Sequence, residues 1–465
     1  MVFVINTERS KELRIKRANT DWWINSKAIV ADNGMTYIGY YTDMGEIHIK
    51  QLDAKCSKTP SQDYRLCKLN CTYADEHNSP SVCVLRSGRI IVAYTGHKVR
   101  HVKYRFTQKP YDISSFCPER YLPYDGAATY VQIYENTIRN EVWMFSRVDG
   151  YKWVFRYSKD EGETWSEPRV FLNTDPGDQF SRYLQERKIY VAELGETKSL
   201  FYFDVRKQDI IVDEMGDEQF FFALYGHPYK SMVHTIRSGI FRSDGQLLRC
   251  DGTPTDLNLY ENDGRVLDLS GLDVVYQAPA DTAYSSRLLD VSSTLPLRVA
   301  FATFHMDQIN NPDPGKPTYF CATFRDGKWN TSEPICKAGE FLAKGIYDGS
   351  QTYLGGMAFY YGIGEAGYEE EVQHLTQINS NRIFLARFDG QDRVLESYVT
   401  WDWGKSYQLE QVIRRIPGEK NIKIWRPIVP IHAQDNMPLY WHEGIYTAHT
   451  GGWHCDTVML VEHDD

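Results

Sequence analysis

The stretch SKDEGETW, residues 158–165, decides the predicted fold. It has the pattern S/T-x-D-x-G-x-x-W of the turn called an Asp box, and TWDWGKSY, residues 400–407, repeats the pattern with a final tyrosine. In this turn the aspartate accepts backbone hydrogen bonds, the glycine takes a positive φ and the aromatic side chain packs beneath. Two copies in one chain predict a β-propeller, in which the Asp boxes are structural turns rather than catalytic ones.

The remainder of the chain agrees with an all-β fold. Aromatic residues make up 14% of its 465 residues, glycine-containing turns separate short apolar runs, and almost no segment has a long helical period. Each blade of four short strands needs roughly 45–65 residues. We therefore predict a single seven-bladed propeller over residues 1–465, without an internal domain boundary and closed by a strand from each end of the chain.

Charge and hydropathy exclude several classes of partner. A net charge of −10 argues against nucleic acid or an anionic membrane surface, although a local cationic pocket could still bind an anionic sugar. No run of 18 apolar residues predicts a membrane-spanning helix. Residues 1–16 lack the pattern of a signal peptide, so the sequence leaves the localisation open.

The nine cysteines are an odd set, with a cluster at Cys56, Cys67 and Cys71. This cluster could be a disulfide region or, together with a histidine, a zinc site, but its spacing fits no standard zinc motif. Free buried thiols are the expected state of most of the nine.

The stretch DEHNSPSVCVLRSGRIIVAYTGH, residues 75–97, indicates a β-hairpin with a histidine at each open end. A turn centred on Ser87 and Gly88 pairs residues whose numbers sum to about 175, and His77 and His97 sum to 174. Facing residues of an antiparallel pair have Cα atoms roughly 5–6 Å apart, so the two imidazoles are predicted to meet. The alternative interpretation is one buried structural histidine and one solvated loop histidine.

A second hairpin, residues 128–147, predicts the same arrangement for Tyr130 and Arg147, whose numbers sum to 277. In a propeller the open ends of both hairpins lie on one face near the axis, and the Asp boxes lie on the opposite rim. We therefore predict that the two histidines, Tyr130 and Arg147 converge on one pocket. A slip of register in either hairpin would separate them.

Two histidines, a tyrosine and an arginine suit β-elimination on a uronic acid. Arg147 would neutralise the carboxylate, a histidine would remove the proton beside it, and Tyr130 or the second histidine would protonate the leaving oxygen. This chemistry requires no metal. A glycoside hydrolase usually needs two facing carboxylates, whereas Asp75 and Glu76 are adjacent and point to opposite faces of an extended segment. A non-catalytic carbohydrate-binding propeller is the third possibility.

The motifs DEHNSPSV, SGRIIVAYTGH, YSKDEGETWS, YGHP, YLGGMAF and WRPIVP follow the order found in propeller proteins with sialidase-type repeats. Over most of its length the sequence resembles the ulvan lyases and L-rhamnose-α-1,4-D-glucuronate lyases, and the spacing of HNSP and GH is the most specific part. The resemblance implies a seven-bladed propeller that cleaves a rhamnose–glucuronate linkage by β-elimination and leaves an unsaturated uronate.

The same resemblance implies individual roles. The two histidines would act as acid and base, with Tyr130 as their partner and Arg147 as the carboxylate clamp, while His227 and Asn78 would bind substrate. Some relatives hold a structural calcium or zinc, for which the sequence assigns no ligands. Others are glycosidases, so a rhamnosidase- or sialidase-like hydrolase stays an alternative. The expected partner is an acidic polysaccharide or oligosaccharide containing glucuronate and rhamnose, and this substrate class favours a secreted or periplasmic protein.

Overall fold

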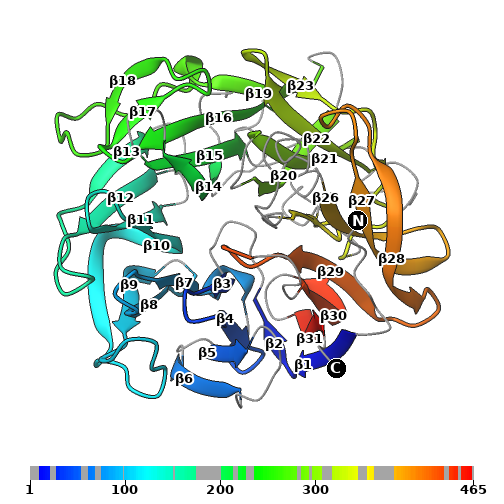
Figure 1. Ribbon diagram of the computed structural model, residues 1–465, viewed down its shortest axis with the longest axis horizontal. Helices are drawn as coiled ribbons and strands as arrows, with labels where there is room; N and C mark the ends of the chain where they lie inside the picture. Colours follow the sequence, from blue (N-terminus) through cyan, green and yellow to red (C-terminus); the bar gives the residue numbers. More distant parts are fainter. Residues whose placement is uncertain are drawn as a thin grey trace, which may run out of the picture.

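The computed structural model shows a β-propeller whose sheets follow one another in chain order around a common centre (Figure 1). The part of the chain that it describes comprises residues 10–20, 28–53, 61–68, 75–97, 99–149, 152–173, 201–212, 218–226, 235–279, 284–292, 296–305, 317–343, 353–360, 382–433, 439–448 and 452–462. None of these residues is α-helical, and none lies in a helix long and apolar enough to cross a membrane. The all-β prediction is confirmed.

The first half of the described chain forms three sheets. The sheet nearest the N-terminus contains β2 (Ala18–Asn19), β3 (Ala28–Val30), β4 (Met35–Thr42), β5 (Glu46–Asp53) and β6 (Gln62–Lys68). The next contains β7 (Ser81–Val84), β8 (Ile90–Tyr94), β9 (Val99–Phe106), β10 (Arg120–Asn136), β11 (Glu141–Val148), β12 (Lys152–Ser158) and β13 (Arg169–Asn173). The third contains β14 (Phe201–Val212), β15 (Glu218–Gly226), β16 (Thr235–Arg242), β17 (Gln246–Leu248), β18 (Pro254–Asn258) and β19 (Asp273–Gln277).

The second half forms three more sheets. The fourth sheet contains β20 (Tyr284–Val291), β21 (Arg298–His305), β22 (Thr318–Arg325), β23 (Lys328–Thr331) and β24 (Cys336–Lys337). The fifth contains β25 (Met357–Phe359), β26 (Arg382–Phe388), β27 (Asp392–Val399) and β28 (Gln408–Pro417). The last contains β29 (Lys423–Ile428), β30 (Leu439–Ala448), β31 (Gly452–Glu462) and β1 (Ser10–Ile15). Two short 3-10 helices, η1 (Glu76–Asn78) and η3 (Leu269–Gly271), connect strands.

The prediction of seven blades is wrong. The described strands form five sheets of four to six strands and a sixth sheet of seven strands. The physical reason is β10, which spans 17 residues, pairs with β9 at its N-terminal end and pairs with β11 over its C-terminal half. The segment PYDG, residues 123–126, has the composition of a turn but here continues the strand. Two hairpin groups are therefore joined into one sheet.

The predicted closure of the ring is confirmed. Strand β1 pairs antiparallel with β31 over Ser10–Ile15, so the last sheet contains strands from both ends of the chain. Joining the first and last strands in this way pairs edges that would otherwise expose unsatisfied backbone groups.

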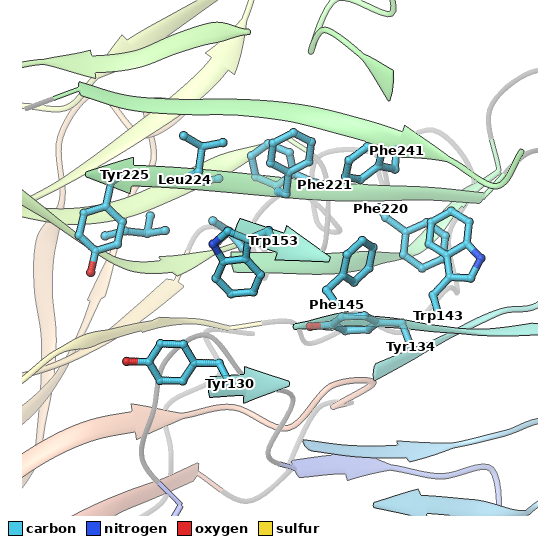
Figure 2. Packing of buried hydrophobic residues seen from close by; sticks show 14 of the residues in the cluster. Tyr130, Tyr134, Trp143, Phe145, Trp153, Phe220, Phe221, Leu224, Tyr225 and Phe241 are labelled. Atoms are coloured by element: carbon cyan, nitrogen blue, oxygen red, sulfur yellow. The ribbon is translucent and has the colours of Figure 1, made fainter. Parts of the chain in front are cut away.

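Aromatic side chains fill the space between neighbouring sheets, as Figure 2 shows for β11, β12 and β15. The rings of Trp143 on β11 and Phe220 on β15 stack with centroids 4.4 Å apart, and Phe145 stacks on Phe241 at 6.1 Å. Such pairs contribute about 0.5–1.5 kcal/mol each beyond the burial of their area. The high aromatic content of the chain is therefore used to pack sheet on sheet.

Both Asp boxes form the predicted turns. Asp160 accepts a hydrogen bond from the Thr164 amide at 2.8 Å, and Asp402 accepts one from the Ser406 amide at 2.9 Å. The first box lies at the far end of its sheet from the predicted site, because Ser158 pairs with Val142 whereas Arg147, at the other end of β11, pairs with Trp153.

Candidate active site

The histidine-bearing hairpin forms, but the two histidines are not strand residues. Pairing between β7 and β8 runs from Val84 opposite Ile90 to Ser81 opposite Ala93 and ends there. The chain before β7 turns into η1, which contains His77. The two imidazoles nevertheless meet: the His77 and His97 rings stack with centroids 3.8 Å apart and an interplanar angle of 10°.

A buried carboxylate connects the two rings. Asp75, only 2% exposed, caps η1 by accepting the His77 amide at 3.0 Å. Its Oδ1 also accepts a short hydrogen bond from Nδ1 of His77, and its Oδ2 accepts one from Nδ1 of His97 at 2.8 Å. Because a carboxylate only accepts, both histidines carry a proton on Nδ1, and Nε2 is the ring nitrogen not engaged by Asp75.

The two histidines also set the charge state of Asp75. Burial by itself would raise the pKa of its carboxyl group. The charge and hydrogen bond of His77, followed by those of His97, act in the opposite direction and hold that pKa well below its ordinary value. Asp75 is therefore an anion at neutral pH.

Tyr130 lies in the same stack because of a β-bulge. The predicted sum of 277 holds along β10 and β11 as far as Val131 opposite Ser146, but the next pair is Thr129 opposite Arg147. Tyr130 is thus the extra residue rather than the partner of Arg147, and its φ of 60° is unusual for a bulky side chain. A bulge changes the direction of a side chain, and bulges are frequent near active sites.

The four predicted residues form a continuous series of contacts. The Tyr130 ring lies nearly parallel to the His77 ring, with centroids 5.2 Å apart, and the Arg147 guanidinium carbon lies 4.3 Å from the centroid of the Tyr130 ring. His77, Tyr130 and Arg147 are buried, whereas 26% of the His97 side chain is exposed. The solvent therefore reaches this series from the side of His97.

Two further residues, Asn78 and His227, were predicted to bind substrate. Asn78 is buried in η1 directly after His77, and His227 lies outside the described residues. Sequence reasoning considered Asp75 only as a possible hydrolase carboxylate and missed its contact with both histidines. A usable signal was present, since an aspartate side chain commonly accepts a hydrogen bond from the backbone amide two residues ahead, which holds Asp75 beside His77.

Asp75, His77 and His97 are also the types of residue that hold metal ions. Their ligand atoms lie within 4.8 Å of one another. The 2.8 Å separation between Asp75 Oδ2 and His97 Nδ1 is that of a hydrogen bond, which a metal bound to both atoms would replace. The cysteines that the structure describes are not joined in disulfides, and Cys56 and Cys71 lie outside the described residues.

Comparison with known proteins supports the family resemblance. Residues 35–203 match the family described as BNR repeat-containing family member. An ulvan lyase of polysaccharide lyase family PL25 superposes with a TM-score of 0.60 over 95% of this chain and 94% of its own, at 14% identity. The chain has the fold of the ulvan lyases.

Two further solved structures agree with this assignment. The PL25 ulvan lyase bound to -[GlcA(1-4)Rha3S]- gives a TM-score of 0.63 at 14% identity, over 97% of this chain and 96% of that chain. The polysaccharide lyase Uly1 gives 0.52 at 11% identity, over 95% and 90%. No curated protein matches the amino-acid sequence.

Proposed function

We propose that this protein is a polysaccharide lyase that cleaves a rhamnose–glucuronate linkage by β-elimination and leaves an unsaturated uronate. The observation that carries the proposal is the contact series from His97 through His77 and Tyr130 to Arg147. It combines proton-transfer groups with a fixed positive charge. A similar fold has been solved with a glucuronate–rhamnose repeat bound, which supports the substrate class.

Arg147 supplies the charge that the first step needs. The proton beside the uronate carboxylate is weakly acidic until that carboxylate is neutralised. The Tyr130 ring covers one face of the Arg147 guanidinium, but guanidinium N–H groups lie in the guanidinium plane and can still bind a carboxylate edge-on. In this proposal Arg147 binds the uronate carboxylate and stabilises the negative charge that develops on it.

The histidine pair transfers the protons. One imidazole takes the proton beside the carboxylate through Nε2, and Tyr130 or the other imidazole protonates the leaving oxygen. Asp75 holds both rings through Nδ1 and offsets the positive charge that the base acquires. Its role resembles that of a carboxylate behind a catalytic histidine, which orients the ring and stabilises the imidazolium without accepting the proton itself.

The proposal gives metal ions no part in the chemistry and leaves any calcium or zinc a structural role. It also assigns no hydrolytic role to Asp75, because both histidines engage this carboxylate. A hydrolase would need a carboxyl group that reaches the glycosidic oxygen.

The experiment is incubation of the full chain with ulvan and with gum arabic, followed by ultraviolet absorbance for the unsaturated uronate and by a reducing-end assay. We expect both signals to rise together and His97→Ala to abolish both. His454→Ala, at an exposed histidine in another sheet, is the matched control. Reducing ends without absorbance would assign a hydrolase, and binding without either signal would assign a carbohydrate-binding propeller.

A further inference from the structure

The two Asp boxes differ in the residues on either side of the aspartate. The aspartate of the first box is flanked by Lys159 and Glu161. That of the second box is flanked by Trp401 and Trp403, and both indole side chains are on the surface, where the two residues are 54% and 37% exposed. A single exposed apolar side chain needs no explanation, but large ones gathered in one place commonly mark a binding surface.

The turn itself does not require these tryptophans. It is formed by the side chains of Thr400 and Asp402, which accept hydrogen bonds from the Gly404 and Ser406 amides. The residue after the aspartate has a positive φ in both boxes, and at Trp403 this φ is 64°. Such a backbone conformation is uncommon outside glycine and least favourable for a bulky side chain. The folding of the turn therefore gives no reason for a tryptophan at this position.

The arginines beside the first box are paired with glutamates of that box. Arg89 and Arg120 both lie over the Phe106 ring, with guanidinium carbons 4.6 and 4.7 Å from its centroid. Arg89 forms an ion pair with Glu161 at 3.3 Å. Arg120 forms one with Glu163 at 2.8 Å. The positive charges on this side of the first box are thus offset within the protein.

The second box lacks both acidic groups, because Trp403 and Lys405 stand where the first box has its two glutamates. The guanidinium carbon of Arg325, at the tip of the β22–β23 hairpin, lies 4.6 Å from the centroid of the Trp403 ring. Arg325 forms an ion pair with the adjacent Asp326 at 3.6 Å, and both side chains are largely exposed, so water screens this pair. Lys405 is exposed as well. Two surface indoles therefore accompany two surface cations.

We propose that the second Asp box, together with the tip of the β22–β23 hairpin, is an ancillary binding site for an anionic polysaccharide. The C–H face of a sugar ring packs on the indoles of Trp401 and Trp403. Arg325 and Lys405 bind the acidic groups of the same chain, as guanidinium and ammonium groups do with carboxylates and sulfates. The choice of an anionic polymer as the ligand rests on the proposed function, but the binding itself does not require cleavage.

This ancillary site is separate from the candidate active site. The second box connects β27 and β28, whereas the active-site residues are built on the sheet of β7 to β13, and these two sheets lie on opposite sides of the ring (Figure 1). A long chain held at one site has a raised effective concentration at the other. A short oligosaccharide cannot span both. We therefore expect the ancillary site to matter for polymers and not for short substrates.

The binding test is electrophoresis of the full chain through a native gel that contains ulvan, with His97→Ala present throughout to prevent cleavage. We expect ulvan to retard the chain. The double variant Trp401→Lys, Trp403→Glu copies the first box without changing the net charge, and it should bind about tenfold more weakly. Val274→Thr, at an exposed apolar side chain of the third sheet, is the matched control and should bind as before.

Three results of this test would overturn the inference. The first is the absence of retardation by ulvan, and the second is equal retardation of the double variant and the control. The third is retardation by neutral dextran as strong as that by ulvan, because the proposed ligand is anionic. If the double variant fails to fold, Arg325→Gln decides, since it leaves the Asp box unaltered. It should weaken the retardation several-fold, and unchanged retardation would overturn the inference.

Two further measurements separate this inference from its alternatives. Without the change at His97, the double variant should need several-fold more ulvan for half-maximal activity and keep full activity on a short ulvan oligosaccharide. An equal loss on both substrates would overturn the inference, and so would a dimer that the double variant dissociates while ulvan still retards it. Retardation lost in the double variant, without turnover by the unaltered chain, would remove the proposed lyase function and leave the ancillary site.

Discussion

The imidazole rings of His77 and His97 stack 3.8 Å apart although no strand pairing joins the two residues. The contact is held by Asp75, whose two carboxylate oxygens each accept from one ring. The carboxylate therefore orients both rings through Nδ1, and Nε2 of each ring is the nitrogen that Asp75 does not engage.

Asp75→Asn tests whether the carboxylate positions the histidines. We expect kcat to fall by about 10–100-fold or more, as for other groups that orient a catalytic ring, and the stability to fall by about 1–3 kcal/mol because charged hydrogen bonds are lost. Steady-state kinetics and urea unfolding measure the two effects. Asp268→Asn is the matched control, because Asp268 caps η3 as Asp75 caps η1 but contacts no histidine in the described chain. Equal kinetics for both variants would contradict the positioning role.

The lowered pKa of Asp75 predicts how this contribution to stability varies with pH. The folded state prefers the carboxylate more than the unfolded chain does, so the stabilisation is fully present above the unfolded-state pKa of about 3.9. It is lost as the pH falls through the lower pKa of the folded state. We expect the stability difference between the unaltered chain and Asp75→Asn to shrink below about pH 4, as measured by urea unfolding. A difference that widens in acid would refute the assigned direction.

Arg147→Met tests the carboxylate clamp. We expect kcat/KM on glucuronate-containing polymer to fall by about 10²–10³-fold, the usual loss when a group that stabilises developing charge is removed. On a methyl-esterified uronate the loss should be much smaller, because that substrate has no carboxylate charge to neutralise. Arg156→Met is the control, since Arg156 also lies over a tyrosine ring, at 4.9 Å, within the same sheet. A similar loss on both substrates would argue against the clamp.

Tyr130→Phe tests whether the tyrosine hydroxyl transfers a proton. The aromatic ring and its contacts remain, so folding should change by less than about 1 kcal/mol, while kcat should fall by about 10²–10⁴-fold. Tyr134→Phe on the same strand is the control. It removes a hydroxyl that donates a hydrogen bond to Gln132 Oε1 at 3.4 Å, and it should leave kcat unchanged. If Tyr130→Phe keeps full activity, the second imidazole is the acid.

Dialysis against EDTA tests the alternative use of Asp75, His77 and His97 as metal ligands. We expect activity on the polymer to survive dialysis, because the proposed steps use only protein side chains. Metal analysis of the dialysed protein by mass spectrometry is the necessary control. Loss of activity that zinc restores would reassign the three residues to a metal centre.

Local patterns in the sequence were sufficient for features that form within a short stretch of chain. The Asp boxes are such a case, because Asp160 and Asp402 bond to amides four residues ahead. The meeting of His77 and His97 was predictable for the same reason, since a tight turn at Gly88 brings both arms of one hairpin together. The all-β class and the ring closure followed from the spacing of such hairpins.

Only the tertiary structure decided the features that depend on where backbone pairing stops or shifts. The continuation of β10 through a turn-like segment joined two groups of strands and changed the blade count. The bulge before Val131 moved Tyr130 out of register with Arg147 and onto the histidine stack. The pairing of β7 with β8 ends at Ser81, so the preceding chain can form η1, which places Asp75 beside Nδ1 of both imidazoles. A shift of one residue changes the local strand propensity of the chain very little, but it turns a side chain to the other face of the sheet. Residue patterns could therefore identify the histidines, Tyr130 and Arg147, but they could not predict the geometry that brings these residues into contact.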